Sequence, residues 1–135
     1  GIITREPPDI LGQYAVRVPK SDPDGNDLGT LLLPDVAVPL ATYTGWNLRR
    51  KEFGADGQLV SLIGSYIPFT KTKAEREKAG DPRASIGERY GTLAKYLERY
   101  RRAGEALVDQ RFLTAEDARR LIARARKRGE WFGEK

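Results

Sequence analysis

The chain has 135 residues, of which 39% are hydrophobic and 32% are charged, a balance typical of a globular protein with a modest core. It contains no cysteine and no histidine, which excludes disulfide bonds, thiolate metal sites and a histidine general base. No run approaches the roughly 18 apolar residues of a membrane span. We predict neither a cofactor nor a metal, and the composition does not indicate a cellular compartment.

Charge differs between the two halves of the chain. Residues 1–70 carry six Lys/Arg and eight Asp/Glu, whereas residues 71–135 carry 18 and 11. Turn residues and β-type runs fill the first half, and helical periodicity fills the second. We therefore predict an α+β fold, in which an extended/β-hairpin N-terminal half with a docking arm packs on a C-terminal helical unit. The two halves are expected to form one domain, the C-terminal part of a larger protein.

The first 18 residues predict an extended lead-in followed by one short strand. Residues 1–12 contain Pro7-Pro8 and show no periodicity. Residues 13–18 alternate between apolar and other side chains, which predicts a strand that Pro19 ends.

Residues 21–27 (Ser-Asp-Pro-Asp-Gly-Asn-Asp) form a turn cluster that invites comparison with a calcium loop. The first three ligand positions of an EF-hand would be filled by Asp22, Asp24 and Asn26. However, Asp27 stands where the loop needs glycine, and Leu33 stands where it needs a bidentate glutamate. The pattern therefore favours a hairpin turn, with residues 29–33 as the returning strand.

Residues 33–50 form the most unusual segment of the sequence. Pro34 and Pro39 exclude a helix interior or a central strand, so the segment is expected to be extended and docked. Aromatic side chains beside an amide and a cation suit a ligand pocket. The alternative, that the aromatics hold an extended arm on a hydrophobic surface, is favoured because no acid–base partner accompanies them. The candidate ligand- or partner-binding residues are Tyr43, Trp46, Asn47, Arg49 and Tyr66.

Residues 59–69 are the most apolar run and predict a strand or a buried extended segment, interrupted by Gly64 and ended by Pro68. Ser65 lies in this run, but it lacks the flanking glycines of the Gly-x-Ser-x-Gly nucleophile elbow, as does Ser85. Ser65 is therefore expected to be a buried strand residue bonded to backbone. No catalytic residue is predicted.

Three helices are predicted after residue 70, each from its N-terminal signal. Thr72 and Glu75 form a capping box that opens a short helix ended by Gly80. Ser85 and Glu88 form a second box, which is expected to open the longest helix. That helix would carry one apolar stripe, made by Ile86, Tyr90, Leu93, Leu97, Tyr100, Gly104, Leu107 and Val108.

Thr114 is expected to cap a third helix, which would pair with the longest helix as an antiparallel αα-hairpin. Its predicted buried face consists of Ala118, Leu121, Ile122 and Ala125. Trp131 and Phe132 are expected to fold back onto this hairpin.

Three blocks, residues 33–49, 64–69 and 80–90, together resemble the C-terminal end of a family of large bacterial proteins called alpha/beta hydrolase domain-containing proteins. The resemblance implies an α/β-hydrolase-fold esterase or lipase that transfers acyl groups through an activated serine. It also implies that the hydrolase core lies upstream, so no triad residue can be assigned here. The chain alone is therefore expected to be inactive, with a structural or pocket-bordering role beside that core.

Other partners remain open. A stand-alone protein-binding module without enzymatic activity is the main alternative, and the apolar stripe would permit self-association. The sequence pI of about 9.6 and pairs such as Arg101-Arg102 invite nucleic-acid binding through the basic helices. Acidic residues are interleaved with these arginines and would repel phosphate, so nucleic acid is not an expected partner. The expected partner is the upstream α/β-hydrolase core or a companion chain.

Overall fold

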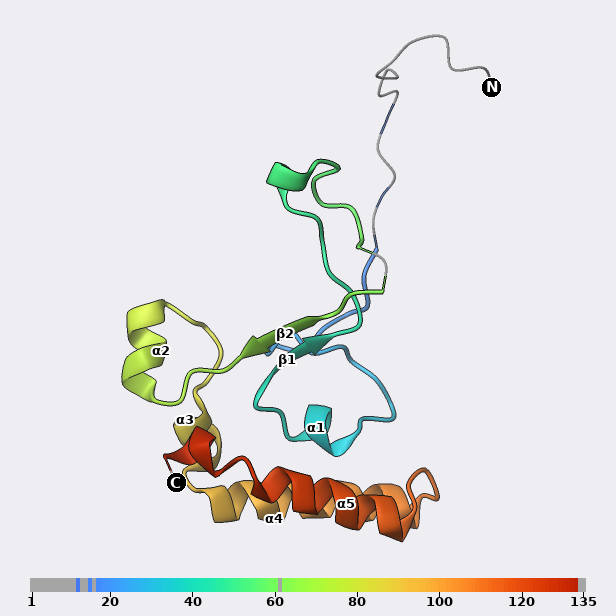
Figure 1. Cartoon of the computed structure of the whole chain (residues 1–135), viewed down its shortest axis with the longest axis vertical. Helices are drawn as coiled ribbons and strands as arrows, with labels where there is room; N and C mark the ends of the chain where they lie inside the picture. The colour runs from blue at the N-terminus through green and yellow to red at the C-terminus, as the bar shows by residue number, and fades with distance from the viewer. Residues whose placement is uncertain (1–11, 13–14, 16, 61, 134–135) are drawn as a thin grey trace.

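The computed structural model describes residues 12, 15, 17–60 and 62–133, and it confirms the predicted α+β class (Figure 1). Two short strands pair antiparallel, with Tyr43 opposite Tyr66. In the described part of the chain the strands are β1 (Ala41–Thr44) and β2 (Ser65–Pro68), the α-helices are α1 (Pro34–Ala37), α2 (Lys73–Ala79), α3 (Ile86–Tyr90), α4 (Leu93–Asp109) and α5 (Ala115–Arg126), and the 3-10 turns are η1 (Lys51–Phe53) and η2 (Gly129–Phe132).

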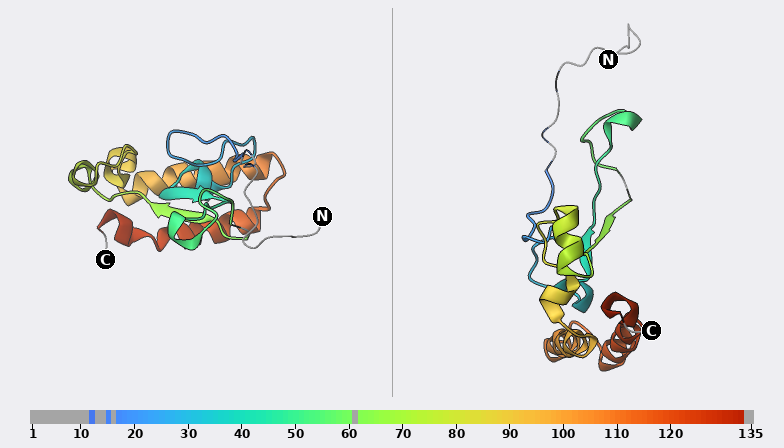
Figure 2. Two further views of the ribbon diagram at one scale, coloured as in Figure 1. Left: turned by 90° about the horizontal axis from the view of Figure 1, so that it is seen from above. Right: turned by 90° about the vertical axis from the view of Figure 1, so that its left-hand side faces the viewer.

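The helices and the sheet lie in successive layers. Helices α4 and α5 lie side by side at one end, and α1 packs on α4 between them and the sheet (Figures 1 and 2). The connection between β1 and β2, which includes η1, extends away from the body on the side opposite α4 and α5 (Figures 1 and 2). The helical end therefore holds the core, and the opposite end projects.

Tyrosine side chains fill much of the core. Tyr96 and Tyr100 on α4 are almost fully buried, and the Tyr96 ring lies 5.4 Å from that of Phe132 and 5.2 Å from that of Tyr90. Tyr96 is not among the residues of the predicted apolar stripe, although it is buried. The buried cluster consists of Val38, Leu40, Phe69, Ile86, Tyr90, Tyr96, Tyr100 and Ala125.

Helix α2 begins and ends as predicted. The Glu75 amide donates to Thr72 Oγ1 (3.2 Å), and Glu75 Oε2 accepts from the Thr72 amide (3.2 Å), which completes the capping box. Gly80 then takes the left-handed conformation at φ 63°, and its amide donates to the Arg76 and Glu77 carbonyls at the end of the helix.

The expected single long helix after Ser85 is wrong, because the structure has two helices there. The Ser85–Glu88 capping box is present, but it opens only α3, which ends at Gly91 with φ 71°. Thr92 then caps α4 through the Lys95 amide (3.3 Å). Apolar spacing continues across this break, so periodicity alone did not reveal the turn.

The αα-hairpin of α4 and α5 is confirmed. Thr114 caps α5 through the Asp117 amide (3.1 Å), and Ala118 and Ala125 are buried against α4. Helices α1, α4 and α5 approach one another at Gly104 on α4, where an added Cβ would lie 3.9 Å from both Ala118 and Pro34. A side chain larger than alanine at position 104 would therefore separate α1, α4 and α5.

One β prediction is wrong, one is confirmed in part, and one lies outside the described residues. Residues 29–33 form no strand, because the turn before them is closed by a single Ser21–Asp27 bridge. Within the described part of residues 59–69, Ser65–Pro68 form a strand and Phe69 is buried, whereas Leu59 and Ile63 are exposed. The strand over 13–18 includes residues 13, 14 and 16, and together with most of the lead-in it lies outside the described residues.

Candidate docking site: the arm between the two strands

The connection between β1 and β2, residues 45–64, is called the arm here, and residue 61 of it lies outside the described part. It is a narrow hairpin. The Arg49 amide donates to Gln58 O (2.8 Å), the Val60 amide donates to Asn47 O (2.9 Å), and Leu48 and Leu59 form an antiparallel bridge. These bonds hold the two sides of the arm together.

Large apolar side chains are exposed along the arm and on β2. Phe53, in η1 at the far end, is 76% exposed, and Leu62, near β2, is fully exposed. The exposed large apolar residues from this region are Leu48, Phe53, Leu59, Leu62, Ile63, Tyr66 and Ile67. Clusters of this kind on a protein surface mark a site of contact with another surface.

The base of the arm is tied to the sheet. The Tyr43 and Tyr66 rings lie 5.4 Å apart across the two strands, and burial together with the neighbouring Tyr66 raises the pKa of Tyr43 to about 12. Trp46 is half-buried, and its Nε1 donates to Asp27 Oδ1 at 3.2 Å. The arm therefore leaves the body from a fixed position.

The candidate residues from the sequence divide into two groups in the structure. Tyr43, Tyr66 and Trp46 lie together at the base of the arm. Asn47 and Arg49 lie on the arm itself, where Asn47 Oδ1 accepts from the Leu48 amide (2.8 Å) and Arg49 is exposed. The five residues are not gathered around one cavity, and their binding role stays a prediction.

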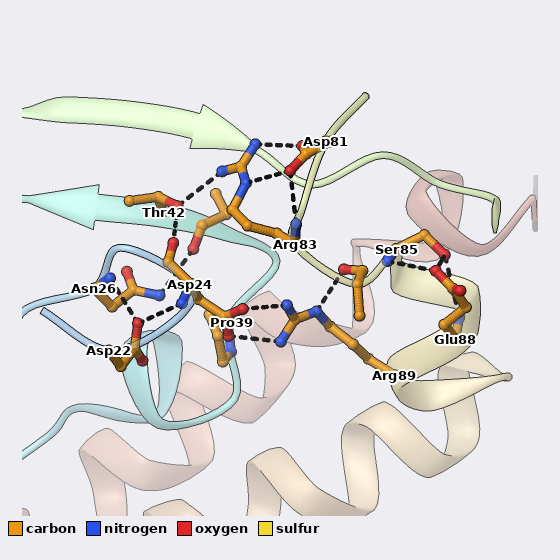
Figure 3. A network of polar contacts seen from close by, with 12 residues as sticks. Asp22, Asp24, Asn26, Pro39, Thr42, Asp81, Arg83, Ser85, Glu88 and Arg89 are labelled. Atoms are coloured by element: carbon orange, nitrogen blue, oxygen red, sulfur yellow. Dashed lines mark hydrogen bonds and ion pairs between the residues drawn. The ribbon is translucent and has the colours of Figure 1, made fainter. Parts of the chain in front are cut away.

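The turn at residues 22–26 holds the outer edge of β1 (Figure 3). Asn26 is 1% exposed; its Oδ1 accepts from the Tyr43 amide (2.7 Å), and its Nδ2 donates to Ala41 O (3.4 Å). Asp22 Oδ1 shapes the turn by accepting from the Asp24 and Asn26 amides at 2.8 and 2.9 Å. The side-chain amide of Asn26 therefore makes hydrogen bonds to β1 that a third strand would otherwise make.

Positive φ makes glycine the suitable residue at the centre of this turn. Gly25 has φ 81°, and a Cβ there would lie 3.0 Å from Thr42 Cγ2 on β1. The three residues that resembled calcium ligands therefore serve the turn and the sheet. Among the described residues there is no group of three or more His, Cys, Asp or Glu side chains that could hold a metal.

Arg89 connects this turn with α3, and Arg83 connects the loop before α3 with the two strands (Figure 3). Arg89 on α3 makes a bidentate ion pair with Asp24 (2.7 Å for Nη1 to Oδ2) and lies 4.2 Å from the centre of the Phe69 ring. Arg83 donates to Asp81 Oδ2 (2.6 Å) and to Thr42 Oγ1 (2.8 Å). Arg83 also holds the pKa of Asp81 below its usual range through these hydrogen bonds.

Sequence reasoning missed both arginines and their partners. Arg89 and Asp24 are 65 positions apart, and no local pattern relates two residues at that distance. The one available signal was the turn chemistry of Asp22 to Asn26, which indicated an ordered turn but not its contact with β1.

A cavity of about 320 Å³ lies between this turn, α1 and α3. Its polar wall consists of Asp22, Asp24, Arg89 and Arg99. Asp24 and Arg89 already neutralise each other, and Arg99 lies 5.6 Å from the centre of the Tyr90 ring. Asp22 Oδ1 is occupied by the Asp24 and Asn26 amides, so the polar groups of this wall serve the turn and its contact with α3.

Three arginines of the basic helices α4 and α5 form ion pairs with glutamate. Arg101 pairs with Glu105, Arg102 with Glu98 and Arg120 with Glu116, each one helical turn away. These pairs place a carboxylate beside each of the three cations, which weakens attraction for phosphate. No helix in the described part of the chain is long and apolar enough to cross a bilayer.

Comparison with known proteins identifies the family. The model of the family described as "Alpha/beta hydrolase domain" matches residues 4–123, which include the arm, the Asp24–Arg89 ion pair (called the clamp here), α4 and most of α5. The chain belongs to the alpha/beta hydrolase domain family. No curated protein and no solved structure matches it.

Ser85 and Ser65 of this alpha/beta hydrolase domain protein both donate hydrogen bonds within the chain. Ser85 Oγ donates to Glu88 Oε2 (2.7 Å), but Ser85 is fully buried as the cap of α3. The Ser85 hydroxyl, the Ser85 amide and Arg76 lower the pKa of Glu88 to about 2, which makes it a poor base. Ser65 is half-buried, and its Oγ donates to Trp46 O (3.3 Å), so it is bonded to backbone as predicted.

Proposed function

We propose that this chain is an accessory portion of an α/β-hydrolase-like protein of the esterase or lipase type. The arm docks on the hydrolase core, and the base of the arm supports or borders the substrate pocket. The catalytic triad belongs to the core. One observation carries the proposal: the family match covers the whole arm, whose apolar side chains are exposed in this chain.

The chemistry of ester hydrolysis supports this division of roles. Acyl transfer by a serine needs a base that accepts the hydroxyl proton, usually histidine, and this sequence has none. Ser85 is engaged as a helix cap and Ser65 bonds backbone, so neither is available as an activated nucleophile. The structure instead supplies a stable body that presents a projecting arm.

Two measurements test the proposal. The intact mass of the native polypeptide should exceed that of this chain several-fold, and the additional sequence should contain Gly-x-Ser-x-Gly. The purified 135-residue chain should be inert towards activated esters such as p-nitrophenyl acetate. Turnover that a single substitution in this chain abolishes would overturn the proposal.

The second candidate function is a stand-alone protein-binding module, and the exposed arm favours it as well. A native chain that starts near Gly1 and still captures a protein partner through the arm would support this module over the accessory portion. Nucleic-acid binding is weaker, because ion pairs occupy Arg101, Arg102 and Arg120. Affinity for nucleic acid that falls steeply with salt would revive it.

A further inference from the structure

The outer part of the arm, residues 48–59, is exposed along its whole length. It projects from the end of the molecule opposite α4 and α5 (Figure 1). Every hydrogen bond that these residues form with described residues lies within residues 47–60. Opening the outer arm therefore breaks the hydrogen bonds of its own hairpin and none of those that join the described parts of the body. Segments with such local contacts open at a low free energy.

Three consecutive cations lie on this exposed segment. Arg49, Arg50 and Lys51 are exposed, and none of them forms an ion pair with another described residue. An endoprotease that cleaves after basic residues recognises such side chains through an acidic specificity pocket. Exposed loop tips are also the preferred sites of proteolytic nicking. The outer arm therefore combines the charge and the exposure that such a protease requires.

Several other exposed cations lie in structure that is harder to open. Lys78, Lys95 and Arg119 lie within α2, α4 and α5. Arg111 lies in the connection between α4 and α5, but its amide donates to Val108 O (2.9 Å) at the end of α4. Opening that connection disturbs the packing of α4 on α5, so the arm is expected to be cut before it.

The two sides of the arm are joined by much more than the arm itself. A cut after Lys51 would give an N-terminal fragment, residues 1–51, and a C-terminal fragment, residues 52–135. Strand β1 of the first fragment pairs with β2 of the second along its whole length. Val38 and Leu40 of the first fragment lie in the same buried cluster as Phe69 and the helical tyrosines of the second. The core is therefore built from both fragments.

Polar contacts also cross between the two fragments. The clamp joins the turn at residues 22–26 to α3. The Tyr90 hydroxyl donates to the buried Pro39 O (2.7 Å), and the Tyr100 hydroxyl donates to Asp35 Oδ2 (3.0 Å). All of these contacts are made by residues outside the arm, so a cut in the arm removes none of them.

We propose that the outer arm is a cleavage site for an endoprotease that cleaves after basic residues, and that the two fragments then remain one folded body. Water adds across the peptide bond after Arg49, Arg50 or Lys51. The C–N bond breaks, the carbonyl carbon takes the hydroxyl to form a carboxyl group, and the nitrogen takes the proton to form an amino group. The cut acts on the uncovered arm, as it stands in this chain, and does not depend on the proposed function.

Limited digestion of the 135-residue chain with trypsin tests the cleavage site, with mass spectrometry to identify the products. The first cut within residues 21–126 should follow Arg49, Arg50 or Lys51. Replacing all three with glutamine should slow the loss of uncut chain by about tenfold or more, because the remaining sites must wait for the body to open.

A matched control replaces three exposed helix cations with glutamine, at Lys78, Lys95 and Arg119, and should leave the rate of the first cut unchanged. A first cut within a helix or after Arg111 would overturn the cleavage site. An equal rate in the arm variant and in the native chain would overturn it as well.

Size-exclusion chromatography of the cut chain tests whether the fragments stay together. Both should elute at the volume of the uncut chain, with an unchanged far-UV circular dichroism spectrum. The urea midpoint of the cut chain should rise with protein concentration, because its unfolding separates two molecules, and the midpoint of the uncut chain should not. Separate elution of the fragments in native buffer would overturn the proposed assembly.

The clamp provides a specific test of what holds the fragments together. In the cut chain, Arg89→Ala should raise the dissociation constant of the fragments by about tenfold or more, because it leaves Asp24 without its partner. Arg120→Ala is the matched control, since its ion pair with Glu116 lies within the C-terminal fragment and should leave the constant unchanged. Equal constants in the two cut variants would refute the clamp as a contact that joins the fragments.

Discussion

The body and the arm differ in the partners that their charged and apolar side chains have within the chain. In the body, an arginine side chain that approaches the interior finds a partner: Arg89 pairs with Asp24, Arg83 with Asp81, and Arg128 with Asp35. On the arm, three consecutive cations have no ion pair with another described residue, and leucine, isoleucine and phenylalanine side chains face solvent. Long-range ion pairs therefore tie the parts of the body together, whereas the described arm has only the hydrogen bonds of its own hairpin and of its base.

The body and the arm are also stabilised by different kinds of contact. Contacts of the body are long-range, because α3, α4, α5, η2 and the residues that flank β1 and β2 share one cluster of tyrosines and other apolar side chains. Contacts of the arm are local backbone bonds between its two sides. Substitutions in the body should therefore change stability, and substitutions on the arm should change association with little change in stability.

Tyr96→Ala should give the largest loss of stability. The ring is fully buried and contacts Tyr90, Tyr100 and Phe132, so its removal leaves a cavity that costs about 3–5 kcal/mol. Urea unfolding followed by circular dichroism measures the change. A loss below about 1 kcal/mol would contradict the packing described here.

Arg89→Ala should be the next most harmful substitution. The side chain pairs with Asp24, donates Nε to Ala84 O (2.7 Å) and stacks on Phe69, so we expect a loss of about 2 kcal/mol. Arg120→Ala is the matched control, because its ion pair with Glu116 is exposed and such pairs contribute about 0–1 kcal/mol. Equal losses in the two variants would show that the clamp is no more than a surface pair.

The sequence was sufficient for the helices whose ends have local signals. Thr72 with Glu75, Ser85 with Glu88, and Thr114 each begin a helix as predicted, since a cap depends on residues three positions apart. The break at Gly91 was missed although Thr92 is also a capping residue. Apolar spacing continues through the break in phase, so periodicity alone predicts one helix where the Thr92 cap begins a second.

Contacts between distant parts of the chain could not be predicted. The Asn26 side chain bonds β1 across 15 and 17 positions, and the Asp24–Arg89 clamp spans 65. Residues 59–69 illustrate a different limit. Their composition predicts burial, but burial depends on what surrounds a segment, and nothing in the described chain covers Leu59, Leu62 or Ile63.

The stability of the body should depend on pH, because Glu88 lies in the body and its pKa is lowered to about 2 from 4.5. A carboxyl group with a lowered pKa stabilises the fold above pH 4.5, and this stabilisation is lost as the pH falls towards 2. The urea midpoint should therefore decrease over that range. The difference between the native chain and Glu88→Gln should be largest near pH 7 and shrink towards pH 2.

Ser85→Ala provides the control for that pH dependence. It removes the hydroxyl that donates to Glu88 Oε2, so the pKa of Glu88 should rise and the acid transition should begin at higher pH. Identical acid transitions in the native chain and in Ser85→Ala would mean that the hydroxyl does not stabilise the Glu88 carboxylate.

The smallest effect is expected on the arm, for Phe53→Ser. The ring is 76% exposed, and its removal should change the free energy of unfolding by less than about 0.5 kcal/mol. Isothermal urea unfolding of the 135-residue chain measures this directly, with Phe69→Ser, a buried residue of the cluster, as the matched control that should unfold the body. A large loss for Phe53→Ser would mean that η1 packs on the body in solution. The arm would then be part of the folding unit, and its apolar residues would need no partner surface to explain them.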